Sequence, residues 1–408
     1  MTLFSNNCRM FMISNSILSF GISAVEVFLG LYLLALGFRE DFIGTYYAVS
    51  TGTSAALLIL MGRLSDRIGR IASFYATLFG HLTGYLILFF YQAPAAIFLC
   101  GFLNGASAAL RACTSSPFLH ENARPSEREY VFSASSSYLL VGSMLGSIAG
   151  GYMPVLFSKF FRAAGMLEAY RYSVIAASAF ILASIWPLFY MKEAPGVRRS
   201  GVPAIDALKH SRCEGNRSFN DPEGLYYYKF VIYTFLIGCG AGLIVPFFNV
   251  YFAQKFSMDS SRIGIIFMIG NIMTAVLMMI TPIITERFGK INSIVVMELM
   301  SLPFLLILGF SASVPLCVAA YFIRGALMNM NNPVFMNIVM ELTPDHERGR
   351  ISSIVTLGDN FSRTISTYVS GMIMTNHGVS QPYALTAAFY TLAAFYIYFS
   401  FARYEKKR

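Results

Sequence analysis

Long apolar runs separated by short polar stretches make up most of this chain. Twelve of these runs reach roughly 20 residues, the length at which a helix crosses the hydrocarbon core of a bilayer. The runs are continuous rather than alternating, so they predict helices and not the strands of a membrane barrel. The predicted spans cover 11–36, 43–61, 71–91, 95–118, 131–155, 171–191, 226–252, 262–284, 291–311, 315–340, 352–375 and 382–402. The first run is too long for a signal-peptide core, so we expect it to be a retained helix.

The two halves of the chain repeat at a constant offset of 220 positions. The corresponding residues are Ile43-Gly44 with Ile263-Gly264, Asp66 with Glu286, Phe102 with Phe322, Gly105-Ala106 with Gly325-Ala326, Glu121 with Glu341, Glu127-Arg128 with Glu347-Arg348, and Gly151 with Gly371. Parallel repeats of membrane helices are typical of one class of transporter. We therefore predict an all-α membrane protein with two pseudo-symmetric six-helix bundles, at 1–191 and 226–408, joined by a cytoplasmic linker at 192–225.

Composition and charge agree with this prediction. Hydrophobic residues make up 56% and charged residues 12% of the 408 positions, whereas about 25% charged residues are usual in soluble proteins. The net charge of +9 invites a nucleic-acid interpretation, but the basic residues are distributed by topology. The predicted spans place 21 of them on one side, 6 on the other and 3 within helices. The positive-inside rule then predicts that both termini are cytoplasmic.

Two short polar tracts lie between spans, one in each half. They are GRLSDRIGR at 62–70 and TERFGK at 285–290. Glycine permits tight turns and close helix contacts, which we expect at Gly62 and Gly69. Arg67 and Arg70 can pair with acids that follow the fourth span. Those acids are Glu121, Glu127 and Glu129.

The first tract resembles the signature between the second and third helices of the major facilitator superfamily, G-x-L-x-D-R-x-G-R. The matching residues are Gly62, Leu64, Asp66, Arg67, Gly69 and Arg70. The repeat, the twelve spans and the weaker second tract extend this resemblance over nearly the whole chain. It implies a secondary transporter that works by alternating access, in which the tract acts as a latch holding one conformation. The latch residues would be Gly62, Asp66, Arg67, Gly69, Arg70 and Arg128, with Glu286 and Arg287 from the second tract; the alternative is simple retention of basic residues on the inner side.

The fifth span is similar to the antiporter signature of drug and proton exchangers, G-x3-G-P-x2-G-G. The sequence reads GSMLGSIAGG at 142–151, so Ser147 stands in place of the proline. Small residues at this spacing also allow close helix packing in lipid. The family's arginine in the fourth span is absent from its usual place, where Gly101 stands, and Arg111 farther along is its possible substitute.

Ionisable groups within spans are costly, by roughly 2.5–3.5 kcal/mol each, and usually face a cavity or a partner. Glu26 in the first span is the candidate proton carrier, because a carboxyl in a medium of low dielectric takes up a proton more readily. Arg111 in the fourth span is its candidate partner, and a cationic substrate would compete for the same carboxylate. The alternative is a fixed Glu–Arg pair that only orders the bundle.

Other charged residues within spans have structural interpretations. Asp359 and Arg363 are four residues apart on one helix and can pair with each other. Arg324 is expected to reach the headgroups. Glu298 and His81 are expected to snorkel or to form local hydrogen bonds.

Two spans contain residues that loosen a helix. The seventh has Gly238, Gly240 and Gly242 before Pro246, and the tenth has asparagines before Pro333. Polar groups in lipid need partners or water, so these spans can line a substrate site or bond to other helices. The candidate substrate-binding residues are Asn249, Tyr251, Asn329, Asn332, Asp359, Arg363 and Tyr138.

Three functions agree with these features. The first is proton-coupled export of small amphipathic or cationic compounds across the cell membrane. The second is uptake or facilitated transport of a small metabolite, with the intramembrane arginines binding an anion. The third is a lipid flippase or a receptor on the same scaffold. The acids and histidines do not cluster with a nucleophile or at metal-ligand spacing, so we predict no enzyme activity, cofactor or metal, and we expect a monomer that binds a small molecule, protons and lipid.

Overall fold

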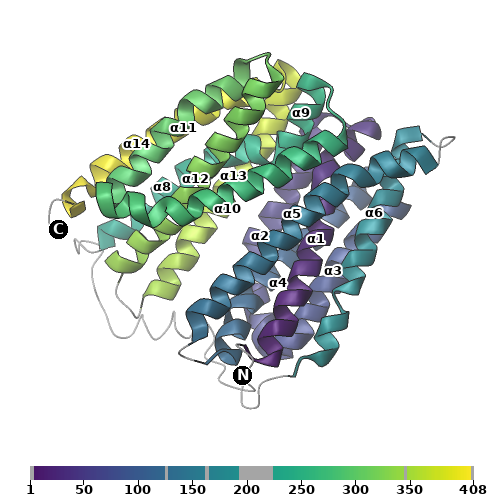
Figure 1. The fold of residues 1–408 in the computed structure, drawn as a ribbon, viewed down its shortest axis with the longest axis horizontal. Helices are drawn as coiled ribbons and strands as arrows, with labels where there is room; N and C mark the ends of the chain where they lie inside the picture. Colours follow the sequence, from purple (N-terminus) through teal and green to yellow (C-terminus); the bar gives the residue numbers. More distant parts are fainter. Residues whose placement is uncertain (1–3, 125–126, 161–164, 193–223, 344–346, 406–408) are drawn as a thin grey trace. The chain divides into compact units, whose positions relative to one another are not determined.

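The computed structural model describes residues 4–124, 127–160, 165–192, 224–343 and 347–405. Its regular structure is helical throughout these ranges (Figure 1). The first six long helices are α1 (Asn6–Ala35), α2 (Glu40–Ile68), α3 (Arg70–Phe90), α4 (Pro94–Asn122), α5 (Arg128–Phe160) and α6 (Gly165–Ala183), followed by the short helix η2 (Trp186–Tyr190). The later helices are α8 (Gly224–Ile244), η3 (Val245–Phe247), α9 (Phe248–Phe256), α10 (Ser260–Phe288), α11 (Lys290–Phe310), α12 (Val314–Leu342), α13 (Arg348–His377) and α14 (Gln381–Glu405).

Ten of the described helices are long and apolar enough to cross a membrane, counting α8 to α9 as one. The other two predicted spans correspond to α12 and α13, which have 29 and 30 residues and carry the asparagines and the Asp359–Arg363 pair within apolar sequence. The predicted all-α membrane fold with twelve spans is confirmed in the described part of the chain. Its seventh span contains a short break.

The chain forms two compact units. Unit 1 contains 1–37, 49–217 and 259–265, and unit 2 contains 38–48, 218–258 and 266–408. The start of α2 therefore groups with unit 2, and the start of α10 groups with unit 1. The predicted linker at 192–225 lies almost entirely outside the described residues.

The first polar tract differs from expectation at one glycine. Gly62 is helical within α2, where an added Cβ would lie 3.8 Å from Cys113 Sγ on α4, an ordinary contact distance. The turn predicted at Gly62 is therefore wrong, because α2 continues through the polar residues to Ile68. The turn at Gly69 is confirmed: its φ of 92° suits glycine and separates α2 from α3 by a single residue.

The two helices expected to be loosened behave differently. The seventh span is broken, since α8 ends at Ile244 and the 3₁₀ turn η3 around Pro246 precedes α9. The tenth span stays one helix, with Pro333 inside α12. Asn329 Nδ2 donates to the carbonyl of Gly325 at 2.8 Å, so the amide side chain bonds within its own helix one turn before the proline.

Unit 1 is built around the α1·α5 contact. An added Cβ at Gly142, Gly146 or Gly150 would lie 2.0–2.3 Å from a carbonyl oxygen of α1. No side chain fits at these positions, so the glycines bring the two backbones into direct contact. The helix-packing interpretation of the G-x3-G pattern is confirmed.

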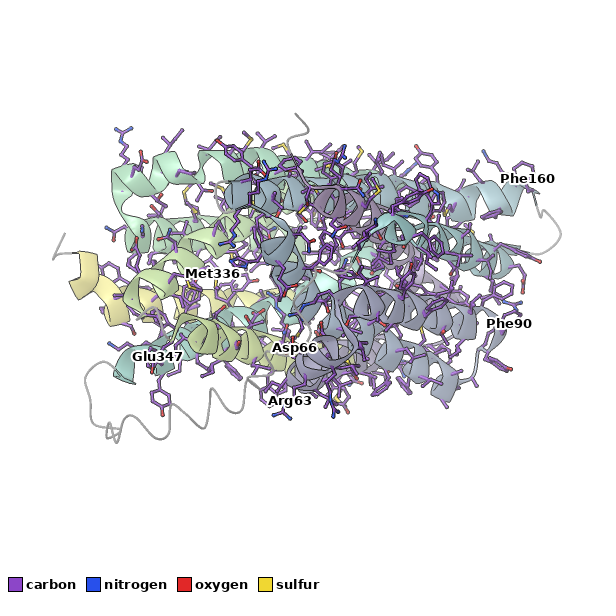
Figure 2. The ribbon with its side chains drawn as sticks, turned by 90° about the horizontal axis from the view of Figure 1, so that it is seen from below. Arg63, Asp66, Phe90, Phe160, Met336 and Glu347 are labelled. Atoms are coloured by element: carbon purple, nitrogen blue, oxygen red, sulfur yellow. The ribbon has the colours of Figure 1, made fainter. Side chains whose placement is uncertain are left out.

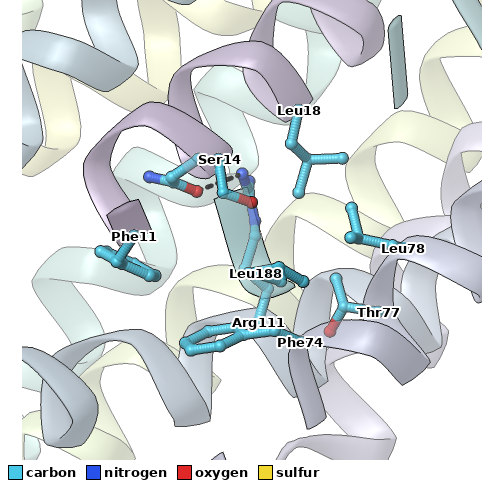
Figure 3. A pocket seen from close by; sticks show the side chains of 9 residues that line it. Phe11, Ser14, Leu18, Phe74, Thr77, Leu78, Arg111 and Leu188 are labelled. Carbon is cyan, nitrogen blue, oxygen red and sulfur yellow. Dashed lines mark hydrogen bonds between the residues drawn. The ribbon is translucent and has the colours of Figure 1, made fainter. Parts of the chain in front are cut away.

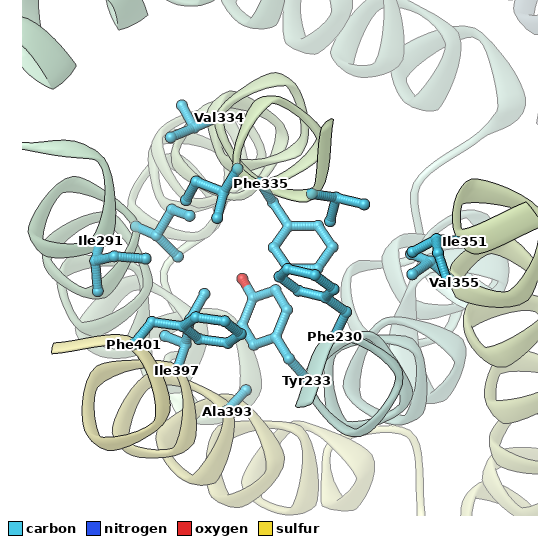
Figure 4. Close-up of a cluster of buried hydrophobic side chains, with 13 residues drawn as sticks. Phe230, Tyr233, Ile291, Val334, Phe335, Ile351, Val355, Ala393, Ile397 and Phe401 are labelled. Atoms are coloured by element: carbon cyan, nitrogen blue, oxygen red, sulfur yellow. The ribbon is translucent and has the colours of Figure 1, made fainter. Parts of the chain in front are cut away.

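Unit 2 is built around the contact of α8 with α13 and an apolar core (Figure 4). Serine and threonine hydroxyls of α13 donate to α8 carbonyls: Thr367 to Gly242 at 3.0 Å, and Ser370 to Leu243. Buried side chains of α8, α11, α12, α13 and α14 form the core, with the rings of Phe230 and Phe401 stacked 5.1 Å apart.

Candidate functional site

Glu26 lies on α1 and is exposed, while its neighbours Val25, Val27 and Phe28 are buried. The carboxylate therefore leaves the packed side of the helix. Asn15 stands eleven residues earlier on the same face, about 16 Å away along the axis at 1.5 Å per residue. This face of α1 is the polar one of an otherwise apolar helix.

Arg111 on α4 is half-buried and reaches this face of α1. Its Nη1 donates to Asn15 Oδ1 at 3.5 Å (Figure 3). The guanidinium borders a small cavity with room for about one water molecule. Phe11, Ser14, Asn15, Leu18, Phe74, Thr77, Leu78, Arg111 and Leu188 line the cavity.

The charges of Glu26 and Arg111 lie within electrostatic range of each other. The hydroxyl of Thr77, on the opposite wall of the cavity, is buried and has no hydrogen-bond partner among the described residues. Unit 1 thus contains an acid, a base and an unsatisfied hydroxyl within apolar helices. This arrangement can bind a proton, a water molecule or a small ion.

His81 on α3 is near this region but is committed to another contact. Its Nδ1 is 2.8 Å from Asn104 Oδ1, and both side chains are buried. Asn104 also donates to Cys100 Sγ at 3.3 Å. The expected local hydrogen bonding of His81 is confirmed.

The first polar tract forms a charge cluster centred on Arg70 at the start of α3. Its Nη1 bonds Asp66 Oδ1 at 2.8 Å and Ser65 Oγ at 2.9 Å, and its Nη2 bonds Glu121 Oε1 at 3.1 Å. The predicted pairing of Arg70 with an acid after the fourth span is confirmed. Figure 2 shows Asp66 beside Arg63, at the end of the helices opposite Phe90.

The remaining predicted latch residues are Arg67, Arg128, Glu286 and Arg287. Arg67 is exposed, and the buried Nε of Arg128, at the start of α5, has no hydrogen-bond partner within the described ranges. Glu286 and Arg287 are exposed on the last turn of α10. Their latch role stays a prediction.

The second tract forms a similar cluster at the repeat-related positions. Lys290 Nζ, at the start of α11, bonds Asn337 Oδ1 at 2.6 Å and pairs with Glu341 on α12. Gly289 has a φ of 82°, close to that of Gly69. The Arg70–Glu121 and Lys290–Glu341 pairs are related by the same offset of 220 that the sequence shows.

Asp359 and Arg363 pair on one face of α13, with Nε and Oδ2 2.8 Å apart. The predicted pairing within the helix is confirmed. Both side chains are part-exposed, and their binding of a substrate stays a prediction.

Asn249 and Tyr251 lie on α9, directly after the break in the seventh span, and both are buried. Asn249 Oδ1 accepts from the amide of Val250 at 2.8 Å. The hydroxyl of Tyr251 donates to the carbonyl of Leu308 and accepts from Lys255 Nζ at 2.9 Å. Lys255 also donates to the carbonyl of Gly309 at 2.7 Å, so these two side chains satisfy the C-terminal carbonyls of α11.

Asn329, Asn332 and Tyr138 are exposed. Asn329 and Asn332 share one side of α12, whereas Asn331 between them is buried. Asn329 and Asn332 therefore lie on the exposed face of α12 and Asn331 on its packed face. Their binding of a substrate stays a prediction.

One expectation for unit 2 is wrong and another is confirmed. Arg324 does not reach headgroups: it is only 4% exposed, and its Nη2 donates to Tyr390 Oη at 2.7 Å. Glu298 is fully buried and accepts a hydrogen bond from the hydroxyl of Tyr233, so the hydrogen bonding expected of it as the alternative to snorkelling is confirmed. In both cases a tyrosine on a neighbouring helix supplies a nearer partner than the headgroups do.

Sequence reasoning missed several of these contacts. Asn15 gave a weak signal, as an amide inside an apolar run, and Lys255 gave another at the end of the seventh span. Tyr233 and Tyr390 gave none, because the chain contains 24 tyrosines and nothing in the pattern marks a buried one.

Comparison with known proteins matches residues 11–220 and 230–408 to the Major Facilitator Superfamily. No curated protein sequence matches the chain. Among solved structures, a bacterial homologue of the human lysosomal transporter Spinster, inward-facing and unoccupied, has a TM-score of 0.79 at 11% identity, covering 100% of this chain and 98% of that one. The nucleoside transporter NupG has a TM-score of 0.70 at 15% identity, covering 97% and 98%, and a D-xylose-proton symporter has 0.71 at 14%, covering 96% and 97%.

These structural similarities, at low identity, show a shared fold. The family match covers nearly the whole chain and agrees with the sequence resemblance, the repeat and the twelve-helix architecture. The protein is thus a multi-pass membrane transporter, not an enzyme, and it belongs to the Major Facilitator Superfamily.

Proposed function

We propose that this protein is a proton-coupled exporter of small amphipathic or cationic compounds. Glu26 carries the coupling proton, and a cationic substrate competes with that proton for the carboxylate. The observation that carries the proposal is the exposed carboxylate of Glu26 on the polar face of α1, within range of the charge of Arg111.

The proposed cycle uses alternating access between two bundles, 1–191 and 226–408, connected through 192–225. Both termini face the cytoplasm of a cell membrane, in keeping with the distribution of basic residues. The Arg70 cluster and the Lys290 cluster stabilise one conformation of this cycle. The proposed substrate-binding residues are the exposed Asn329, Asn332 and Tyr138 and the part-exposed Asp359–Arg363 pair, whereas the predicted residues Asn249 and Tyr251 are buried. The protein works as a monomer.

Arg111 supports a second candidate, the transport of a small anion. Its guanidinium borders a cavity with Asn15 and the unsatisfied hydroxyl of Thr77. These groups are hydrogen-bond donors of the kind that bind carboxylates and phosphates. Under this alternative Arg111 binds the substrate and Glu26 has a supporting role.

The experiment uses the full chain in liposomes with a pH-sensitive dye inside. A pH gradient is imposed, and organic cations, organic anions and neutral metabolites are added in turn. The wild type is compared with Glu26→Gln and Arg111→Gln. Glu168→Gln is the matched control, because Glu168 already pairs with Arg171 on its own helix at 2.7 Å.

Export of cations predicts that a cation dissipates the gradient in the wild type and in Glu168→Gln but not in Glu26→Gln. Dissipation by cations that is unchanged in Glu26→Gln contradicts the assignment of the proton carrier. A response to anions alone that is lost in Arg111→Gln supports the second candidate instead.

A further inference from the structure

A carboxyl group is enclosed in the centre of unit 2. Glu298, on α11, has no exposed surface, and its Oε1 accepts a hydrogen bond from the hydroxyl of Tyr233 on α8. Its Oε2 is also buried and has no hydrogen-bond partner in the described part of the chain. A buried polar atom left unpaired costs about 1–3 kcal/mol, and more when it is charged.

A second unsatisfied group lies at the same level on α12. Ser301 Oγ on α11 is 3.3 Å from Met328 Sδ, and Lys290 Nζ is 2.6 Å from Asn337 Oδ1, so the two helices run antiparallel in a fixed register. Glu298 is three residues before Ser301, and Asn331 is three residues after Met328. This antiparallel register therefore places Glu298 level with Asn331. Both amide atoms of Asn331 are buried and lack a hydrogen-bond partner among the residues described.

Apolar side chains surround this level of the unit. In Figure 4 the Tyr233 hydroxyl points into the cluster that contains Val334 and Phe335. Val334 and Phe335 follow Asn331 by one turn on the same side of α12. Packed apolar side chains therefore surround the carboxyl.

The titratable and charged groups around Glu298 come from each packed helix. They are Tyr233 of α8, Arg324 of α12, Tyr390 of α14, and the Lys290–Glu341 pair at the start of α11. Tyr390 lies within electrostatic range of Tyr233 and accepts a hydrogen bond from Arg324. Arg324 is thus a buried cation of this network, bonded to Tyr390 rather than to the acid itself.

We propose that Glu298 is a second proton-binding site of this transporter, which gains and loses its proton inside unit 2. Tyr233 and Asn331 are its positioning residues. The protonated form provides an O–H donor at the level of the unsatisfied Asn331 oxygen. The deprotonated form keeps the Tyr233 hydrogen bond.

The oxygen ligands available around Glu298 favour a proton over a metal cation. One carboxylate, one amide oxygen and one tyrosine hydroxyl are too few oxygens for a hard cation, which needs six or more. A proton requires one acceptor oxygen, and Glu298 Oε2 is available. The proposal does not rest on the function of Glu26, since proton binding is measured without substrate or gradient.

The test is infrared difference spectroscopy of the purified full chain in lipid nanodiscs during a pH titration. We expect a carboxylic C=O band that disappears as the pH rises in the wild type and in Glu26→Gln. The band is absent in Glu298→Gln, and this variant binds one proton fewer than the wild type over the titration. Tyr233→Phe keeps the band but moves its frequency, because the carboxyl loses its hydrogen bond.

Three results overturn the proposal. The first is a Glu298→Gln spectrum that titrates as the wild type does. The second is a band of Glu298 that persists unchanged at every pH, which identifies a permanently neutral structural acid. The third is an unmoved band in Tyr233→Phe, which decides the question if Glu298→Gln does not fold.

Discussion

The α1·α5 contact of unit 1 and the α8·α13 contact of unit 2 are equivalent in the repeat but are held together differently. The offset of 220 relates Gly142, Gly146 and Gly150 of α5 to Ser362, Ser366 and Ser370 of α13. In unit 1 the glycines bring two backbones together. In unit 2 the hydroxyls of Ser366, Thr367 and Ser370 bond across to α8, whereas that of Ser362 donates to the Asp359 carbonyl of its own helix.

The glycines of unit 2 lie on the other partner of this contact. An added Cβ at Gly238 or Gly242 of α8 would lie about 2 Å from the hydroxyl of Ser362 or Ser366, at 1.9 and 2.1 Å. Lipid provides little hydrophobic drive for helix association, so close packing and interhelical hydrogen bonds have to supply it. The comparison shows that this helix contact needs small residues on one of its two helices, and that either helix can carry them.

The charge clusters differ in a similar way. Arg70 bonds Asp66, Glu121 and Ser65, whereas Lys290 bonds Asn337 and Glu341. A guanidinium can hold several acceptors in fixed geometry, and an ammonium acts as a point charge. Unit 1 therefore has the more directional of the two clusters.

The largest expected effect separates the two polar tracts. Asp66→Asn removes a charge from the Arg70 cluster, and we expect near-normal expression with transport reduced about tenfold or more, corresponding to the loss of one charge-assisted hydrogen bond. Glu286→Gln changes the repeat-related acid and should reduce transport less. Liposome flux normalised to protein content measures both. Equal activity of Asp66→Asn and the wild type contradicts the latch assignment.

The next effect compares two glycines at one repeat position. An added Cβ at Gly105 lies 2.2 Å from the carbonyl oxygen of Ser50, whereas Gly325 has nothing within 4 Å. Gly105→Ala should destabilise the protein by about 1–3 kcal/mol through overpacking. Gly325→Ala should be neutral or stabilise by up to about 1 kcal/mol, since alanine favours helix. Thermal unfolding in detergent measures the two shifts, and shifts of the same sign and size would show that the two environments do not differ as described.

An exchange of residues between the two helix contacts sharpens the comparison further. Gly150→Ser places a side chain 2.0 Å from the Ala24 carbonyl oxygen and should cost about 1–3 kcal/mol. Ser370→Gly removes the hydrogen bond to Leu243, and such bonds average about 0.6 kcal/mol between membrane helices. The melting temperature should therefore fall more for Gly150→Ser. The reverse order would mean that hydroxyl bonding, rather than close packing, dominates both contacts.

The sequence predicted the membrane fold, the repeat and the pairing of Arg70 and of Asp359 with Arg363, because these depend on local periodicity and spacing. It did not predict that α2 continues through Gly62, since a polar tract is as compatible with a helix end as with a turn. It misplaced Arg324, and it named no partner for Glu298. Their partners are tyrosines 66 and 65 positions away, and only tertiary packing brings such residues together.

The candidate site was predicted less completely than the fold. Glu26 and Arg111 stood out because charges are rare in apolar spans. Asn15 and Thr77 did not, because neutral polar residues are common in such helices. Their relation to Arg111 depends on how α1, α3 and α4 pack around one cavity, which no sequence spacing specifies.

The smallest expected effect is the coupling energy within each of the two ion pairs. Double-mutant cycles on Arg70–Glu121 and on Lys290–Glu341, with alanine at each position, should give coupling energies in the range of about 0.2–1 kcal/mol usual for accessible pairs. The Arg70 pair should lie at the upper end, since its side chain is only 13% exposed and two of its nitrogens bond the same carboxylate oxygen, at 3.1 and 3.3 Å. Raising the salt concentration should weaken the Lys290 coupling more, because its side chain is 23% exposed and its attraction is less directional. A Lys290 coupling energy equal to or larger than that of Arg70 would contradict this ranking. It would show that the geometry of the guanidinium adds nothing to the strength of the ion pair.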